Sequence, residues 1–229
     1  MLLKMKNFNI TEVYHRQPRK SDGIAHQIAC KKSVNQMGEF LEWLVGSDKW
    51  DLKTHKNYLD SCSRQRFPLR TIPFFWQNEM VGMGFVRPSS WDHSAEIMYW
   101  VNTDFAGLGI GEHIAQVMIK EAFRNPETFH ALIKTDRDNV GSKRIMEKIG
   151  AEETLYMGYT THHGVQSNMI LWLVDNPAIA SFQRLDLRFL FNPWSGNIGP
   201  IRFQQEDEPD YSQVSDPSLI KPRKKPIEK

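Results

Sequence analysis

The chain has few cysteines and lacks a long apolar run. Only Cys30 and Cys62 are cysteines among its 229 residues, and neither has the spacing of a metal-binding motif. We expect both thiols to be reduced and structural, and the spacing predicts no metal site. No apolar stretch approaches the roughly 20 residues that a membrane-spanning helix needs. The start of the chain, Met1–Lys6, does not resemble a signal peptide. These absences favour a cytoplasmic protein without a membrane partner.

The composition is that of a globular protein with one sizeable core. Hydrophobic residues make up 40% of the chain and charged residues 24%, with a formal net charge of +2. Basic residues are more frequent in the first third than in the middle of the chain. Such a bias could attract an acidic substrate, a nucleic acid or a phosphorylated cofactor, but the basic residues are spread out, which favours an ordinary solvated surface.

Hydrophobic periodicity predicts an α/β fold, a single domain with a mixed central sheet. We expect strands at 24–29, 71–77, 80–86, 95–101, 129–135, 153–161 and 165–174, and helices at 35–45, 52–66, 109–123 and 139–149. The predicted organisation is an N-terminal segment (1–23), the α/β domain (24–175), a packed C-terminal extension (176–203) and a disordered tail (204–229).

A glycine-rich turn lies between a predicted strand and a predicted helix. Gly107, Gly109 and Gly111 alternate with other residues just where the helix begins. The first turn of a helix has unpaired N–H groups and a positive dipole end, and glycines let a ligand approach the backbone closely. The turn could therefore bind a pyrophosphate. Glycines with this spacing also occur in tight turns that bind nothing, so the motif is weak evidence by itself.

A second motif follows one strand and one helix later. Asn139 stands at the predicted start of a helix, Ser142 lies three residues on along roughly the same face, and Gly150 follows its end. Asn139 could hydrogen-bond an amide of a ligand such as a pantetheine arm, or it could only cap the helix, which is locally the simpler interpretation.

Together, Ala95–Val101, the Gly107–Gly111 loop and the run from Asn139 to Gly150 resemble the GNAT superfamily of N-acetyltransferases, most closely its RimJ/RimL-type branch. The resemblance covers about residues 70–175. It implies acetyl-CoA as the acyl donor, with its pyrophosphate on the backbone amides of Leu108, Gly109, Ile110 and Gly111. It also implies that Tyr99, Trp100 and Val101 pair with the pantetheine arm, and that Asn139 and Ser142 lie beside the thiol.

The catalytic residues are predicted less directly. Glu96 precedes the phosphate loop in the position where many family members carry a base, and it could equally be an ordinary strand carboxylate. Met146 stands where many members have a tyrosine that protonates the leaving thiolate, and Ala106 stands where Arg or Gln usually begins the loop. Ser142 and Tyr156 are therefore the candidate donors. The expected reaction is direct attack by an amine on the acyl-CoA, without a covalent enzyme intermediate.

The acceptor remains open at the level of sequence. A protein N-terminus or a small amine fits the resemblance best. The predicted acceptor region also contains aromatic and basic residues that could bind a nucleic-acid base in tRNA or DNA. A third alternative is a non-catalytic acyl-CoA-binding module, which the departures at Ala106 and Met146 permit. The sequence leaves a homodimer open.

Overall fold

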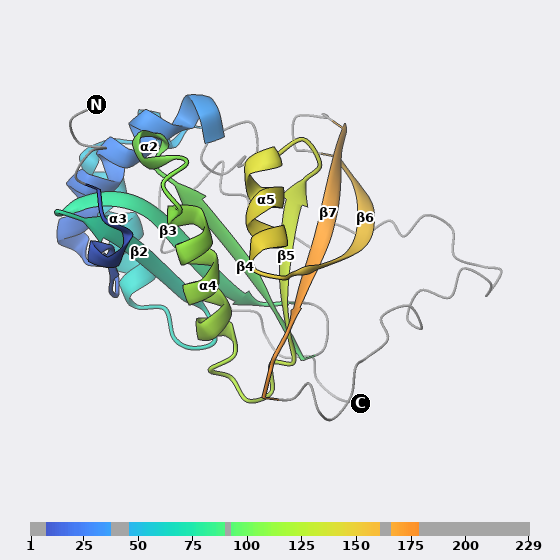
Figure 1. The fold of residues 1–229 in the computed structure, drawn as a ribbon. Coiled ribbons are helices and arrows are strands. Elements are labelled where there is room, and N and C mark those ends of the chain that lie inside the picture. The colour runs from blue at the N-terminus through green and yellow to red at the C-terminus, as the bar shows by residue number, and fades with distance from the viewer. Residues whose placement is uncertain (1–7, 38–45, 90–92, 161–165, 179–229) are drawn as a thin grey trace, which may run out of the picture. The chain divides into compact units, whose positions relative to one another are not determined.

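The structure is a computed structural model that describes residues 8–37, 46–89, 93–160 and 166–178 (Figure 1). The contacts between Cα atoms divide the chain into Met1–Asn176 and Pro177–Lys229, and every helix and strand given below lies in the first unit. The extension and tail expected at 176–203 and 204–229 lie outside the described residues beyond residue 178. In the described part of the chain, no helix is long and apolar enough to span a bilayer.

A seven-stranded mixed sheet forms the centre of the first unit, which confirms the α/β prediction. Its order is β1-β2-β3-β4-β5-β7-β6, and β4 and β5 form its parallel pair while the other neighbours are antiparallel. The strands are β1 (Tyr14–His15), β2 (Arg70–Trp76), β3 (Glu79–Pro88), β4 (Ser94–Val101), β5 (His130–Asp136), β6 (Glu152–Thr160) and β7 (Gln166–Asp175). The sheet therefore begins at β1, before residue 24.

Helices cover both faces of this sheet (Figure 1). They are α2 (Gly23–Met37), α3 (Leu52–Ser63), α4 (Ile110–Ala122) and α5 (Val140–Lys148), with short 3₁₀ turns η1 (Ile10–Glu12), η2 (Lys20–Asp22), η4 (Ser47–Lys49) and η5 (Thr103–Phe105). One core lies between the sheet and α4, and includes Ile97, Val101, Ile114 and Met118. A second, smaller core includes Ala29, Cys30, Leu59 and Trp100 and lies under α2 and α3.

The strand predicted at 24–29 is wrong, because these residues begin α2. Ile24 and Ile28, which suggested a buried strand, are 54% and 49% exposed, whereas His26 and Cys30 are buried. The helix thus turns its imidazole and thiol inward and its isoleucines outward. The helix predicted at 35–45 overlaps only the last turn of α2, and residues 38–45 lie outside the described chain. The predictions for the other strands and helices are confirmed to within a few residues.

Candidate functional site

The sheet opens into a wedge between β4 and β5. The two strands pair over only four positions, from Ser94 opposite His130 to Ile97 opposite Ile133. Beyond them they diverge toward the end of the sheet where α4 and α5 begin (Figure 1). The edge of β4 over Met98–Val101 therefore has no strand beside it on the β5 side in the described structure. Its backbone N–H and C=O groups can pair with an extended ligand in the manner of an added strand.

The predicted phosphate loop lies where β4 leads into α4. Gly109 is the N-cap of α4 with a φ of 81°, and Gly107 has a φ of 79°. The first helical bond runs from the His113 N–H to the Gly109 carbonyl. Among the described residues, the N–H groups of 110–112 have no protein acceptor. A Cβ added at Gly107 or Gly109 would meet nothing within 4 Å, so the loop has an open face that can take an anion.

Gly111 has a different role from the other two glycines of the motif. A Cβ at this position would lie 2.6 Å from Cδ1 of Ile145 on α5, and Gly111 itself is buried. Its lack of a side chain lets α4 pack closely against α5. Its N–H still belongs to the first turn of α4, so Gly111 can contribute an amide while its side-chain position is used for packing.

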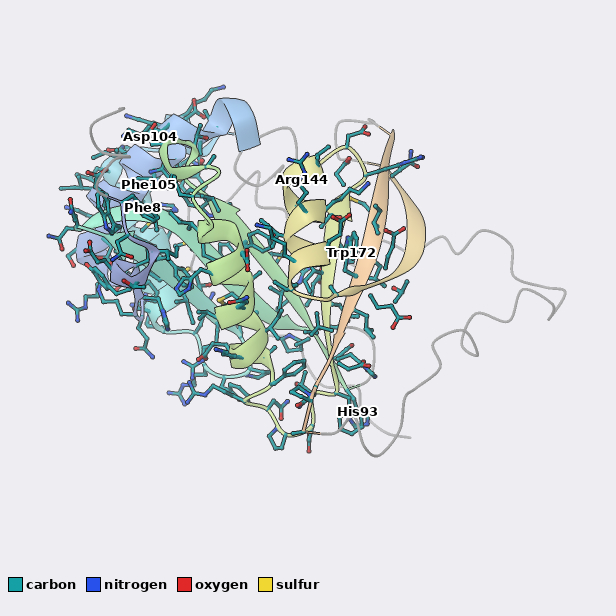
Figure 2. All side chains as sticks on the ribbon, in the orientation of Figure 1. Phe8, His93, Asp104, Phe105, Arg144 and Trp172 are labelled. Atoms are coloured by element: carbon teal, nitrogen blue, oxygen red, sulfur yellow. The ribbon has the colours of Figure 1, made fainter. Side chains whose placement is uncertain are left out.

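Aromatic packing and one asparagine hold the loop in place. The Phe105 ring in η5 lies 6.1 Å from Trp76 and 6.2 Å from Phe8, and Figure 2 shows Phe8 and Phe105 side by side. Asn102 is buried; its side chain donates to the Met80 carbonyl at 3.0 Å and accepts from the Asp104 N–H at 3.2 Å. Asn102 was not predicted as a site residue, although an asparagine just after a strand and before a turn is a recognisable cap.

Tyr99, Asn139 and Ser142 meet across the wedge. The Asn139 side chain accepts a hydrogen bond from the Ser142 N–H at 3.0 Å, so Asn139 does cap α5. The hydroxyls of Tyr99 and Ser142 are 2.9 Å apart. Burial raises the pKa of Tyr99 to about 12, partly offset by the hydrogen bond to Ser142. Tyr99 is thus neutral at physiological pH and can donate to Ser142, a contact between two predicted site residues that the sequence did not indicate.

Glu96 lies on the other face of β4, together with Met98 and Trp100. Its side chain is mostly buried, and cations engage both carboxylate oxygens. Arg87 contacts Oε2 through Nε at 2.9 Å and through Nη2 at 2.8 Å, while Lys134 Nζ lies 3.2 Å from Oε1. The three residues of this ion-paired group, Arg87, Glu96 and Lys134, lie on the adjacent strands β3, β4 and β5. Oε1 is the oxygen with the single, longer contact, and Lys134 is the more exposed of the two cations.

The remaining predicted positions are of three kinds. Trp100 packs under α2, and Val101 lies in the core below α4, so each offers its backbone rather than its side chain to the wedge. Met146 is fully buried in the same core as Val101. The backbone of Tyr156 pairs with Ile170, but its side chain lies outside the described structure.

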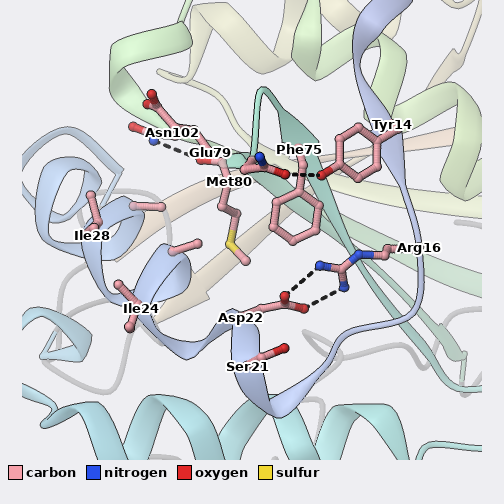
Figure 3. Close-up of a pocket in the computed structure, with 13 residues that line it drawn as sticks. Tyr14, Arg16, Ser21, Asp22, Ile24, Ile28, Phe75, Glu79, Met80 and Asn102 are labelled. Atoms are coloured by element: carbon pink, nitrogen blue, oxygen red, sulfur yellow. Dashed lines mark hydrogen bonds and ion pairs between the residues drawn. The ribbon is translucent and has the colours of Figure 1, made fainter.

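A cavity of about 340 Å³ lies at the beginning of α2, beside the β2–β3 turn (Figure 3). Its polar side chains largely satisfy one another. Arg16 and Asp22 form an ion pair at 2.6 Å, and the Tyr14 hydroxyl donates to Asn78 at 3.2 Å. The wedge between β4 and β5 combines an unpaired strand edge with the open amides of α4, so it is the better candidate site.

An open strand edge beside a helix N-terminus that begins at a glycine can accommodate an extended ligand with an anionic group. The family model described as an acetyltransferase (GNAT) domain matches residues 13–152. The chain therefore belongs to the GNAT acetyltransferase family, a family of N-acetyltransferase enzymes. No curated protein matches the sequence.

Solved structures of acetyltransferases have the same fold. RimL, a ribosomal L7/L12 alpha-N-protein acetyltransferase in complex with coenzyme A, has a TM-score of 0.63 at 19% identity, covering 72% of this chain and 94% of its own. The microcin C7 self-immunity acetyltransferase MccE, in complex with acetyl-CoA and AMP, has a TM-score of 0.64 at 14% identity, covering 72% and 93%. The ribosomal-protein-S5-alanine acetyltransferase from Vibrio fischeri has a TM-score of 0.60 at 13% identity, covering 74% and 96%.

Proposed function

We propose that the protein transfers the acetyl group of acetyl-CoA to an amine by direct attack within a ternary complex. The observation that supports this most strongly is that the unpaired edge of β4 and the open amides at the start of α4 lie side by side. A pyrophosphate on the α4 amides and a pantetheine arm along Met98–Val101 would occupy both features at once. Such a cofactor would direct its thioester into the wedge, toward Tyr99 and Ser142.

The chain's own residues supply the groups that direct attack requires. The amine nitrogen bonds to the thioester carbonyl carbon, and its surplus proton passes to Glu96 Oε1, directly or through a water. Arg87 holds Oε2 and so keeps the carboxylate in place, while Lys134 moves away from Oε1. A backbone N–H of β4 stabilises the oxyanion. When the C–S bond breaks, Ser142 donates a hydrogen bond to the CoA thiolate, and the proton held by Glu96 passes through water to the sulfur, which restores the Glu96 carboxylate.

The phosphate loop can be tested without disturbing the fold. Asparagine tolerates positive φ better than most residues, and a side chain at Gly109 meets no protein atom within 4 Å. Gly109→Asn should therefore fold normally but place an amide side chain in the anion site, and we expect at least tenfold weaker acetyl-CoA binding by calorimetry. Gly150→Asn is the matched control, since Gly150 has a φ of 73° and equally open surroundings at the far end of α5.

The two variants together decide the assignment. Weakened acetyl-CoA binding in Gly109→Asn alone supports the loop as the pyrophosphate site. Equal affinities in the two variants would contradict it. Release of CoA from acetyl-CoA, assayed with peptides, small amines and oligonucleotides in parallel, then identifies the acceptor class. CoA binding without CoA release for every acceptor would support the non-catalytic alternative instead.

A further inference from the structure

A cluster of two imidazoles and a thiol lies between α2 and α3, away from the acyl-CoA wedge. His26 and Cys30 are one helical turn apart on α2, and His55 comes from α3. The Nδ1 atoms of His26 and His55 are 2.9 Å apart, and Cys30 Sγ lies 3.5 Å from His26 Nε2. All three side chains are buried, with 1% exposure or less.

The cluster has the dimensions of a metal site. One potential ligand atom from each residue lies within 4.8 Å of the other two. Zn–N bonds of about 2.0 Å and Zn–S bonds of about 2.3 Å in a tetrahedral site separate the ligand atoms by roughly 3.3–3.6 Å. An ion takes one nitrogen from each ring, and one such set of atoms already lies within 4.8 Å, so modest side-chain movements would bring the atoms to coordinating positions.

The protonation states also suit a cation. Burial, followed by the proximity of His55, lowers the pKa of His26 to about 3. Burial, followed by the charge of Lys31, lowers the pKa of His55 to about 4. Both rings are therefore neutral near pH 7 and have a lone pair to offer. Burial raises the pKa of the Cys30 thiol to about 12, but a bound metal displaces a thiol proton.

Hydrogen bonding alone does not satisfy the cluster. The two facing Nδ1 atoms can share only one proton, so one ring donates and the other accepts. With either direction of that bond, Nε2 of the fully buried His55 has no hydrogen-bond partner among the described residues. An unpaired buried polar group costs about 1–3 kcal/mol. The structure thus has three buried potential ligands, of which His55 keeps one ring nitrogen without a hydrogen-bond partner among the described residues.

An aromatic shell surrounds these three residues. The Tyr58 ring stacks on His26 at 5.3 Å, Trp50 lies 5.4 Å from His55, and Trp100 of β4 lies 6.3 Å from His26. Such a shell excludes water and so strengthens the interaction between a cation and its ligands. Local spacing could not reveal the cluster, because its third member is 25 residues beyond Cys30 on another helix.

We propose that His26, Cys30 and His55 bind a zinc ion that joins α2 to α3. Mixed imidazole and thiolate ligands suit zinc among the common divalent cations, and these three residues would fill three of its four tetrahedral positions. The ion would act as a structural link between the two helices above the Trp100 side of the sheet. Zinc here has no part in the proposed acetyl transfer, and its test does not depend on that proposal.

The test uses the full chain, stripped with a chelator and titrated with zinc or with cobalt as a spectroscopic substitute. We expect one equivalent of cobalt with a thiolate-to-cobalt charge-transfer absorption, and a zinc-dependent rise in the thermal midpoint. Cys30→Ser should abolish the charge-transfer absorption and weaken zinc binding at least tenfold. Cys62→Ser is the matched control, because Cys62 is also buried but lies outside the cluster.

His55→Gln provides a second, independent variant, whose folding is checked by circular dichroism. It should also weaken zinc binding at least tenfold, so the test holds even if Cys30→Ser fails to fold. A wild-type protein without the cobalt–thiolate absorption would overturn the proposal. So would zinc binding that is equally tight in the wild type, Cys30→Ser and His55→Gln.

Discussion

Glu96, the candidate base, is constrained by ion pairs. It lies in β4, and Arg87 and Lys134 contact both its carboxylate oxygens. If Glu96 is the base, Glu96→Gln should lower kcat by about 10²-fold or more, since general-base catalysis contributes at this scale. Acetyl-CoA affinity should change less than about twofold, because the cofactor contacts lie elsewhere.

Steady-state rates and calorimetric affinities check this prediction. Glu121→Gln is the control, since Glu121 also forms an ion pair, with Arg124, but lies in the last turn of α4. A purely structural role for Glu96 would instead lower the thermal midpoint and leave kcat of the folded protein unchanged.

Tyr99 and Ser142 form the second pair of interest at this scale. If Tyr99 donates to Ser142, the Ser142 proton is directed toward the sulfur, and Tyr99 acts as a positioning residue. Tyr99→Phe should lower kcat by roughly two- to tenfold, the equivalent of one hydrogen bond. Ser142→Ala should have a larger effect, and the double variant should be no slower than Ser142→Ala.

A double-mutant cycle on kcat measures this coupling. Additive losses in the double variant would mean that the two hydroxyls act separately. Acetyl-CoA affinity, measured for each variant, distinguishes an effect on the chemical step from an effect on binding.

At the scale of elements, periodicity predicted most strands and helices because their buried faces are apolar. The strands of the β2–β3 hairpin and the helix α4 have such faces, and the structure confirms them. Residues 24–29 were misread because α2 buries His26, Ala29 and Cys30 and exposes two isoleucines. The hydrophobic pattern of this segment therefore indicates the solvent face rather than the core. Only the packing of α3 against α2 explains why polar side chains lie inside.

The wedge shows the same limit for the site. The glycine loop and the Asn139 cap could be predicted, because each depends on residues close in sequence. The divergence of β4 from β5 depends on pairing between strands separated by α4, and no local pattern encodes it. The contact between Tyr99 and Ser142 follows from that divergence and was missed for the same reason.

The α4–α5 contact gives a prediction at this scale. In Gly111→Ala, the new Cβ would lie 2.6 Å from Cδ1 of Ile145. Because Cδ1 is the end of a side chain that can rotate, and alanine favours a helix more than glycine does, we expect a net loss of about 1 kcal/mol or less in the free energy of unfolding. Ile145→Val removes that Cδ1, so it should restore part of the stability when combined with Gly111→Ala.

Urea unfolding of the two single variants and the double variant tests the contact. The double variant should be more stable than the sum of the two single losses predicts. Strict additivity would show that α4 and α5 accommodate the extra methyl elsewhere.

At the scale of the whole molecule, the alternation of β4 assigns two tasks to the two faces of one strand. Tyr99 faces α5, while Glu96 lies on the opposite face with Trp100. In the proposed mechanism, the thioester would therefore reach across the β4 edge, at the opening of the wedge, to lie near both groups. Neither layer of helices alone could hold donor and acceptor, so the sheet is the element that joins the proposed binding and chemical steps.

The extent of the folding unit yields the last prediction. The described cores draw all their residues from positions 8–174. The unit closes at Asn176, whose N–H donates to the Phe129 carbonyl at 2.9 Å and whose side chain donates to the Thr128 carbonyl at 3.0 Å. A chain ending at Ala178 should therefore unfold cooperatively, with a thermal midpoint near that of the full chain, and bind acetyl-CoA with an affinity within about threefold. Calorimetry measures both quantities.

A chain ending at Asp175 lacks both Asn176 hydrogen bonds at the end of β7. Its free energy of unfolding should fall by about 1–3 kcal/mol, the usual effect of two lost hydrogen bonds. If the Ala178 chain aggregated or lost its affinity for acetyl-CoA, residues beyond 178 would be required for the fold or the site.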